Sequence, residues 1–105
     1  MVNSATETPA TTPSLPPIDH QPAPYGGPTK SEVRQLRATY LNPAIFHYYP
    51  DDPIMIVEGY KQYLYDETGR RYLDGFAGIV TVSVGHSHPK VIAAAQRQLD
   101  HLQHT

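Results

Sequence analysis

The sequence predicts a small α+β fold, in which a short helix, a three-stranded antiparallel meander, an apolar strand-like run and a second helix follow one another. Three observations support this prediction. Short alternating runs between residues 54 and 74 are separated by turn residues. Residues 79–84 are mostly β-branched. Apolar residues recur at spacings of three and four before and after these runs.

Composition divides the chain near residue 29. Residues 1–28 contain most of the eleven prolines and neither lysine nor arginine. We therefore expect residues 1–28 to form a disordered, Pro-rich leader, because they hold too few large apolar side chains to build a core. Residues 29–105 remain as one folded segment, of a size at which a domain is only marginally stable alone.

A first helix is predicted over residues 30–40, because Thr29 or Ser31 can cap its start and Pro43 prevents its continuation. The aromatic stretch that follows, residues 44–50, is irregular and ends in a proline turn. We expect it to form a packed loop, either against another subunit or along the wall of a pocket.

The meander is predicted to have three strands and two turns. The strands are residues 54–58, 61–66 and 71–74, and the turns are residues 59–60 and 67–70. In the second turn Asp66 can accept backbone hydrogen bonds, and Gly69 can supply a positive φ. Alternation along the middle strand puts Tyr63 and Tyr65 on one face of the sheet.

The apolar run of residues 79–84 would need cover on both faces if it formed a strand. It leads into the turn Gly85-His86-Ser87-His88-Pro89. Pro89 suits the first position of a helix, where a missing N–H costs nothing. We predict that this helix runs to about Gln103, with His88 or Ser87 as its cap.

His86 and His88 form the most chemically suggestive pair in the sequence. In an extended segment, residues two apart project to the same side, so the pair could supply two zinc ligands. No third ligand has a signature spacing, and we expect no metal site. The favoured alternative is structural, with the imidazoles satisfying backbone groups at the turn.

Charge and composition exclude several classes of function. The net charge of −2 and the scattered cations give no basic patch for nucleic acid. The chain has no cysteine, no apolar stretch long enough for a membrane span, and no arginine before Arg34. These features predict a cytoplasmic protein without a transit peptide. By pattern alone the sequence shows no complete active site.

Several motifs together nevertheless resemble one enzyme family. Residues 63–74, Gly78-Ile79 and Gly85-His86-Ser87-His88-Pro89-Lys90-Val91 resemble the N-terminal segment of class III pyridoxal-phosphate aminotransferases. Within that family the run of residues 78–91 is most similar to the alanine–glyoxylate branch. The resemblance covers about residues 40–105, and the Pro-rich leader has no counterpart in the family's core pattern.

The resemblance implies a homodimeric enzyme of fold type I that uses pyridoxal 5'-phosphate. It would transfer an amino group from an amino acid such as alanine to a 2-oxo acid such as glyoxylate. Residues 29–105 would be the start of its small domain, truncated before the large domain that carries the cofactor's lysine. The chain would then be inactive alone, with no catalytic or cofactor-binding residue of its own.

Only three substrate-pocket positions carry over from the family: Tyr49, Ile79 and Val80. We expect the Tyr49 hydroxyl to face a substrate carboxylate, while Ile79 and Val80 form an apolar wall that limits substrate size. Core packing is the alternative role for the two aliphatic residues. A different function also stays open, in which the chain is a stand-alone interaction module that binds a partner through its open sheet edges.

Overall fold

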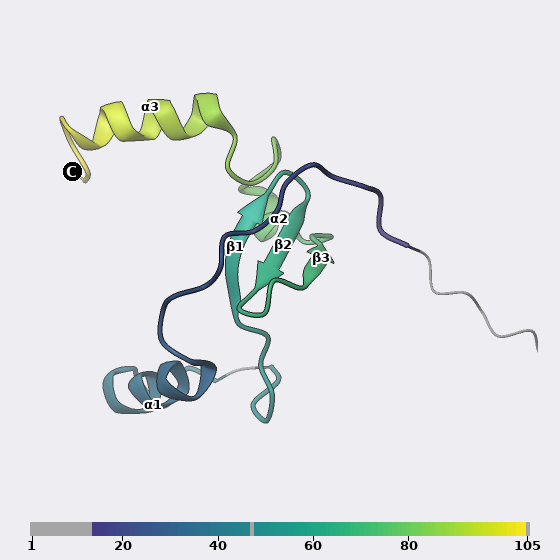
Figure 1. Ribbon diagram of the computed structural model, residues 1–105. Helices are drawn as coiled ribbons and strands as arrows, with labels where there is room; N and C mark the ends of the chain where they lie inside the picture. Colours follow the sequence, from purple (N-terminus) through teal and green to yellow (C-terminus); the bar gives the residue numbers. More distant parts are fainter. Residues whose placement is uncertain (1–13, 47, 105) are drawn as a thin grey trace, which may run out of the picture.

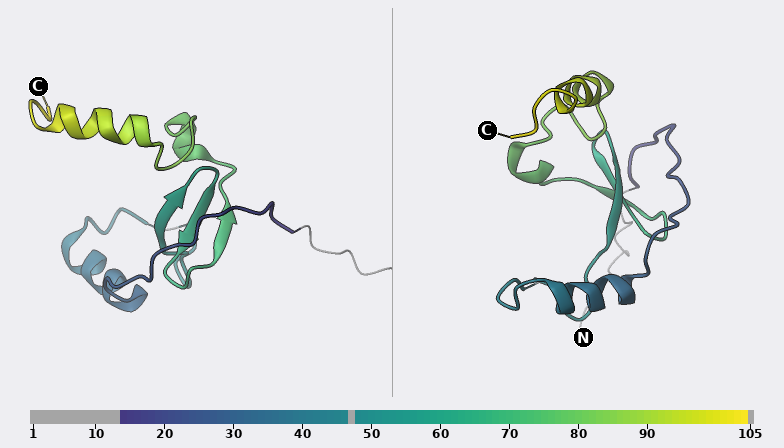
Figure 2. Two further views of the ribbon diagram at one scale, coloured as in Figure 1. Left: turned by 45° about the horizontal axis from the view of Figure 1, so that its top comes forward. Right: turned by 90° about the vertical axis from the view of Figure 1, so that its left-hand side faces the viewer.

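The computed structural model describes residues 14–46 and 48–104 and confirms the α+β fold (Figure 1). The elements are α1 (Lys30–Tyr40), β1 (Ile56–Tyr60), β2 (Tyr63–Asp66), β3 (Arg71–Leu73), α2 (Ala77–Val80) and α3 (Pro89–Leu99). The strands form one antiparallel sheet in the order β1-β2-β3. Figure 2 shows α1 beyond one end of this sheet and α3 beyond the other. None of the helices in the described ranges is long and apolar enough to cross a membrane.

Helix α1 has the predicted bounds, and Thr29 rather than Ser31 caps it. The Thr29 Oγ1 accepts a hydrogen bond of 3.2 Å from the Glu32 N–H. In return the Glu32 carboxylate accepts bonds of 2.7 Å from the Thr29 N–H and hydroxyl, which lower the pKa of Glu32. This reciprocal capping box satisfies donors at the start of α1 and fixes where the helix begins.

The first strand and its turn differ from the prediction. Strand β1 includes Gly59 and Tyr60, which were expected to form the turn, and the chain instead reverses at Lys61 and Gln62. Lys61 adopts a left-handed φ of 51° there. The pairing of β1 with β2 also shifts register between Ile56 and Glu58. The turn was misplaced because Gly59, a residue type common in turns, lies inside β1.

The second turn forms as predicted around the Asp66 carboxylate. Its Oδ1 accepts hydrogen bonds from the Thr68 N–H (2.9 Å), the Thr68 hydroxyl (2.6 Å) and the Arg70 N–H (3.0 Å). Its Oδ2 accepts one from the Tyr72 hydroxyl at 2.7 Å. Burial raises the pKa of Asp66, but these four bonds outweigh it and lower the pKa to about 2. Gly69 closes the turn at φ 82°.

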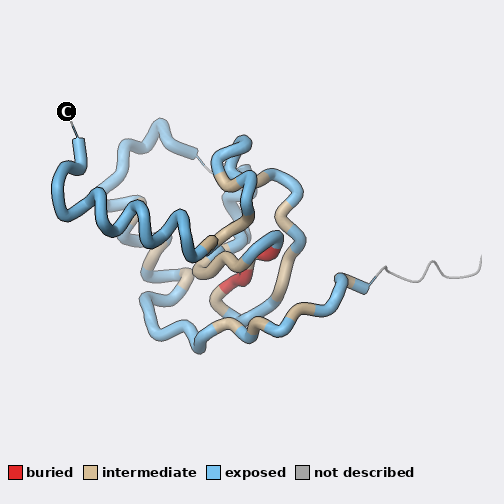
Figure 3. Tube along the Cα trace, turned by 90° about the horizontal axis from the view of Figure 1, so that it is seen from above, coloured by how far each residue is buried: buried red, intermediate tan, exposed pale blue. Residues whose placement is uncertain are grey.

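The core lies under one face of β2. Tyr63 and Tyr65, predicted to share a face, are 0% and 2% exposed and are the buried hydrophobic residues among those described. Figure 3 shows burial confined to this stretch of the chain. Large apolar side chains elsewhere, in α3 and in the loop after α1, are exposed. The sheet therefore protects a small core, and much apolar surface faces outward.

Residues 16–23, which we call the strap, cross the face of the sheet that carries the two buried tyrosines (Figure 1). The Tyr63 hydroxyl donates a 3.0 Å hydrogen bond to the Pro16 carbonyl. Residues 1–28 were predicted to be a disordered leader. Within that range residues 1–13 lie outside the described residues, and the strap is ordered against the sheet, which corrects the prediction there.

His20 is the anchor of the strap. Its ring stacks on Tyr60 with a centroid distance of 4.2 Å and meets the Tyr65 ring edge-on at 5.5 Å. Its Nε2 is hydrogen-bonded to the Glu58 carboxylate, which also accepts a 3.1 Å bond from the Ala23 N–H. A Pro-rich segment can therefore dock through one aromatic side chain, although it is too polar to form a core of its own.

The apolar run of residues 79–84 is not a strand, contrary to the prediction. It begins within the single turn of α2 and continues through turn residues. Strand propensity depends on packing against neighbouring strands, and in the described part of the chain no strand pairs with this run. Instead the main chain of His86 pairs with Lys61 and closes the run into a loop.

Helix α3 begins at Pro89 as predicted but ends at Leu99, four residues before the expected Gln103. Its N-cap is His88, whose side chain makes no capping hydrogen bond. Figure 2 shows α3 extending away from the sheet. In the described residues α3 contacts no other helix or strand, so local preferences alone set where it ends.

Replacing the Asp66 carboxylate should destabilise the fold in a pH-dependent way. We expect Asp66→Asn to lower the free energy of unfolding at pH 7 by about 2 kcal/mol. This is the free energy that corresponds to a pKa lowered from 3.8 to about 2. Because the folded-state pKa is lowered, the wild-type protein keeps this stabilisation above the unfolded-state pKa. It loses the stabilisation as the pH falls through 2.

Urea unfolding followed by tyrosine fluorescence at pH 7 and pH 2 measures this difference. Asp100→Asn, at an exposed position after α3, is the control and should unfold like the wild type. Equal stability of the Asp66→Asn and wild-type proteins at pH 7 contradicts the role given to the carboxylate.

Removing the His20 ring should release the strap from the sheet. In His20→Ala we expect cleavage before Asp19 by an aspartate-specific protease to accelerate several-fold, because an undocked segment is open to the protease. Cleavage before Asp51, in the exposed loop after α1, is the internal reference. An unchanged ratio of the two cleavage rates would show that His20 does not anchor the strap.

Candidate functional site

The loop between α1 and β1 carries the first predicted pocket residue. Tyr49 is 73% exposed and lines an open pocket of about 360 Å³. Apolar and aromatic side chains share this pocket with it: Phe46, Tyr48, Pro53 and Ile54. A tyrosine hydroxyl at the rim of an apolar pocket can bind a polar group of a ligand whose body lies against the rings.

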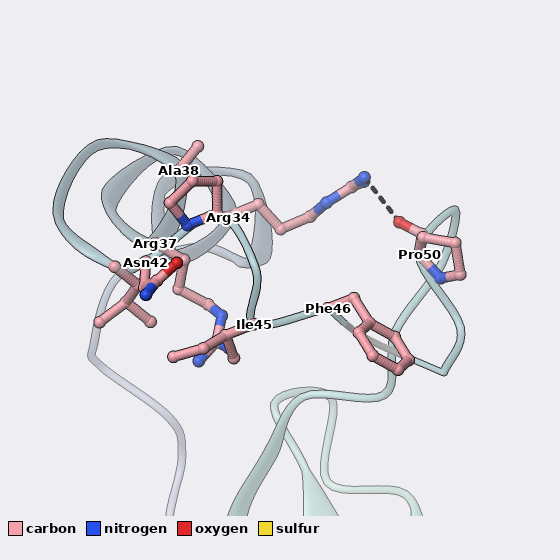
Figure 4. Close-up of a pocket in the computed structure, with 9 residues that line it drawn as sticks. Arg34, Arg37, Ala38, Asn42, Ile45, Phe46 and Pro50 are labelled. Carbon is pink, nitrogen blue, oxygen red and sulfur yellow. Dashed lines mark hydrogen bonds between the residues drawn. The ribbon is translucent and has the colours of Figure 1, made fainter.

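Arg34 of α1 holds this loop in place. Its guanidinium donates hydrogen bonds of 2.8 Å to the Pro50 carbonyl and 3.1 Å to the Asp51 carbonyl. Figure 4 shows Arg34 reaching across to Pro50 at the edge of a pocket of about 410 Å³, which is also lined by Arg37 and Ile45. A guanidinium among apolar side chains is suited to pair with a carboxylate.

Lys30, one turn earlier in α1, ties the same loop to the sheet. Its Nζ lies 3.1 Å from the Asp52 Oδ1 and 3.3 Å from the Glu67 Oε1. The two carboxylates raise the pKa of Lys30. The lysine therefore joins α1, the aromatic loop and the β2–β3 turn, and it is positively charged at neutral pH.

Ile79 and Val80, the other two predicted pocket residues, lie on α2 and are 70% and 82% exposed. A pocket of about 180 Å³ lies beside α2 and is lined by Asp74, Ala77 and His86 among others, but not by Ile79 or Val80. The two aliphatic side chains thus form an outward-facing apolar surface, and the alternative role in core packing does not apply within the described residues.

The structure does not bring the three predicted pocket residues together. The loop that carries Tyr49 lies with α1 at one end of the sheet, whereas α2 lies toward the other end (Figure 2). The two surfaces are therefore separate in the described residues. Their membership of one substrate pocket stays a prediction.

Asp74 follows β3 and binds both the next turn and His86. Its Oδ1 accepts hydrogen bonds of 2.9 Å from the N–H groups of Phe76 and Ala77. Its Oδ2 accepts a 2.6 Å bond from the His86 Nε2. These bonds, that of His86 first, lower the pKa of Asp74. The position of Asp74 just before Gly75-Phe76 is a sequence signal for its bonds to the turn. The sequence gives no such signal for its bond to His86, which is twelve residues away.

His86 is held by three contacts: a hydrogen bond to Asp74, packing on Gly59 and backbone pairing with Lys61. The metal hypothesis did not predict these contacts. The His86 ring packs on Gly59, where an added Cβ would lie 2.7 Å from the ring Cγ. The intervening Ser87 has a left-handed φ of 59°, so His86 and His88 are not in an extended segment. In the described ranges no three His, Cys, Asp or Glu side chains are grouped to hold a metal ion.

The lysines in this chain do not fit the role of holding pyridoxal phosphate. That role needs an amine in a desolvated pocket, where its pKa is lowered. Lys30 is held by two carboxylates that raise its pKa, and Lys61 and Lys90 are exposed. We therefore assign no cofactor-binding residue among those described.

Comparison with known proteins identifies a family. Residues 47–105 match the family model of aminotransferase class-III. The mitochondrial alanine–glyoxylate aminotransferase 2 homolog 2 of Arabidopsis thaliana is 47% identical over 90 residues, which are 86% of this chain and 19% of that protein. The mitochondrial alanine–glyoxylate aminotransferase 2 of Homo sapiens is 44% identical over 95 residues, which are 90% of this chain and 18% of that protein. This chain spans less than a fifth of either relative.

The match also reaches the strap. A match over 95 of 105 residues leaves out at most ten, so it extends over residues 16–23 in this relative. The family model itself begins at residue 47, in agreement with the expectation that the leader has no counterpart in the family's core pattern. Among solved structures, an ornithine aminotransferase from Toxoplasma gondii with partial occupancy of PLP in its active site is similar, with a TM-score of 0.57. It is 31% identical, and the similarity covers 73% of this chain and 17% of that one.

Adding a methyl group at Gly59 should disturb the seat of His86. We expect Gly59→Ala to lower the free energy of unfolding by about 1–3 kcal/mol, because the new Cβ would overlap the His86 ring and Cβ, which cannot move freely. Gly75→Ala is the matched control, since nothing lies within 4 Å of a Cβ there. Urea unfolding midpoints compare the two, and equal midpoints would refute the steric argument.

Proposed function

Because this chain belongs to the class-III aminotransferase family, we propose that it forms the substrate-facing N-terminal segment of an alanine–glyoxylate type aminotransferase. The whole enzyme transfers an amino group from an amino acid such as alanine to a 2-oxo acid such as glyoxylate. Residues 29–105 are the start of its small domain. The residues that hold the cofactor belong to a large domain outside this sequence, so the chain is inactive alone.

One observation carries this proposal: the identity of 44% to 47% with two alanine–glyoxylate aminotransferase 2 proteins, over most of this chain. The choice of alanine and glyoxylate comes from the names of those relatives. Pyridoxal phosphate is the cofactor that the family uses, and it supplies the electron sink needed to move the amino group. This chain's contribution is to bind and orient the substrates.

Within the proposed pocket the hydroxyl of Tyr49 binds a substrate carboxylate. Arg34 supports it by fixing the loop through the Pro50 and Asp51 carbonyls. Ile79 and Val80 supply an apolar wall that favours small side chains such as the methyl group of alanine. Their exposure in this chain supports the proposal, because side chains that complete a pocket with other residues must face outward here.

We also propose a homodimeric enzyme, in which the exposed apolar side chains of the loop after α1 are covered by protein. The proposed compartment is the cytoplasm. Both curated relatives are named as mitochondrial proteins. Subcellular fractionation with an antibody to residues 54–104 decides between the two compartments.

The function is tested on the protein purified at its native length from its source. Supplied with pyridoxal phosphate, it should convert alanine and glyoxylate to pyruvate and glycine, and the 105-residue chain alone should not. A native-length protein that neither acquires the absorbance of the bound cofactor nor transfers the amino group contradicts the enzyme function. The interaction-module hypothesis would then take its place.

Removing the Tyr49 hydroxyl should weaken substrate binding. In the native-length protein we expect Tyr49→Phe to raise the KM for glyoxylate about tenfold. This is the effect expected from the loss of one hydrogen bond to a charged group. Steady-state kinetics measure it. Tyr40→Phe, at an exposed position at the end of α1, is the control and should keep the wild-type KM. Equal KM values for Tyr49→Phe and the wild type would remove Tyr49 from the pocket.

A further inference from the structure

Four consecutive residues in α2 adopt a left-handed backbone. The φ angles of Ala77, Gly78, Ile79 and Val80 are 52°, 56°, 54° and 60°. Such angles suit glycine, but in a β-branched residue the side chain is crowded against the backbone. Ile79 and Val80 would by themselves prefer an extended conformation. Contacts outside these four residues must therefore hold the left-handed turn, which we define as residues 77–80.

The Asp74 carboxylate holds the start of the left-handed turn. Its Oδ1 accepts hydrogen bonds of 2.9 Å from the N–H groups of Phe76 and Ala77, which fixes the direction in which the chain enters. The side chain of Asp74 is only 7% exposed. The carboxylate is thus well placed to resist competition from water at these two bonds.

His86 ties the end of the loop to the same carboxylate. Its Nε2 donates a 2.6 Å bond to the Asp74 Oδ2. Its own position is set by the sheet, because its backbone exchanges hydrogen bonds of 2.8 Å and 3.0 Å with Lys61 and its ring packs on Gly59. The Ser87 hydroxyl adds a 2.8 Å bond to the Gly59 carbonyl. One carboxylate therefore joins both ends of the segment that contains Ile79 and Val80.

We propose that Asp74 and His86 are positioning residues for the substrate pocket, because the hydrogen bond between them holds Ile79 and Val80 in the left-handed turn. Neither residue touches the substrate. Without the pair, residues 79–84 relax toward the extended conformation that their composition favours, and the apolar wall is lost. The part of this inference that concerns substrates rests on the proposed function, whereas the part that concerns the turn does not.

The backbone arm of the test uses NMR spectroscopy on the full 105-residue chain. A residue with positive φ gives a strong NOE between its own amide and α protons, so Ile79 and Val80 report the turn directly. We expect this signal to be lost in Asp74→Ala and in His86→Ala. His101→Ala, at an exposed position after α3, should keep it.

Unchanged signals of Tyr63 and Tyr65 show that each variant stays folded. If Asp74→Ala does not fold, Asp74→Asn decides, since it keeps an acceptor oxygen for Phe76 and Ala77 and weakens only the bond to His86. Strong intraresidue NOEs at Ile79 and Val80 in the folded variants would overturn the proposal.

The kinetic arm uses the protein at its native length. We expect kcat/KM for alanine to fall at least about tenfold in each single variant, because the wall is misplaced. The double variant should lose no more than either single variant, since the two residues act as one unit. Fully additive losses, or an unchanged kcat/KM when the NOEs are gone, would refute the positioning role. If the wild type lacks transaminase activity, the proposed function fails, and the NMR result still decides whether the pair holds the turn.

Discussion

The Asp66 carboxylate is the interaction on which the sheet depends. It gathers donors from the β2–β3 turn and from Tyr72, and so fixes β3 alongside β2. Strand β2 is central and pairs with both neighbours. The sheet in turn supports the other elements. Glu67, the residue after Asp66, forms an ion pair with Lys30 of α1. A charge that is nearly removed from water but fully hydrogen-bonded thus organises a fold with a very small core.

The strap completes that core from outside the sheet. Without it, the ring of Tyr65 would lose the contact with His20, and the Tyr63 hydroxyl would lose its acceptor on Pro16. The strap and α2 lie on opposite faces of the sheet (Figure 2). The inclusion of the strap in the match to the human relative agrees with a structural role. Residues 16–23 therefore contribute contacts to the folded unit.

Local signals in the sequence predicted the local features. The cap at Thr29, the turn at Asp66 and the start of α3 at Pro89 depend on neighbouring residues, and all three are present. Features that depend on distant residues were missed. Gly59 was interpreted as a turn residue, yet it is needed because the His86 ring packs on it. The strap was missed because it docks through a few contacts with residues 35 or more positions away, such as that of Pro16 with Tyr63.

In the candidate site, too, the sequence suggested individual residues but not their arrangement in space. Resemblance to a family suggested Tyr49, Ile79 and Val80, but spacing alone could not place them in space. The β-branched run was expected to be extended, and the left-handed turn arises from the contact of Asp74 with His86, twelve residues apart. No local rule connects those two positions. Where strong local preference and structure disagree, the stabilising contacts are long-range, and the disagreement itself marks a functional candidate.

The order of the elements has a consequence for biosynthesis. All three strands lie within residues 56–73 and pair only with neighbours in sequence, so the sheet has a low contact order and can form rapidly. The strap and α1 precede the sheet in the chain. When residue 73 has left the ribosome, the partners of Tyr63 and Tyr65 described above have already been synthesised. This unit can therefore assemble during translation, before the residues of α3 emerge.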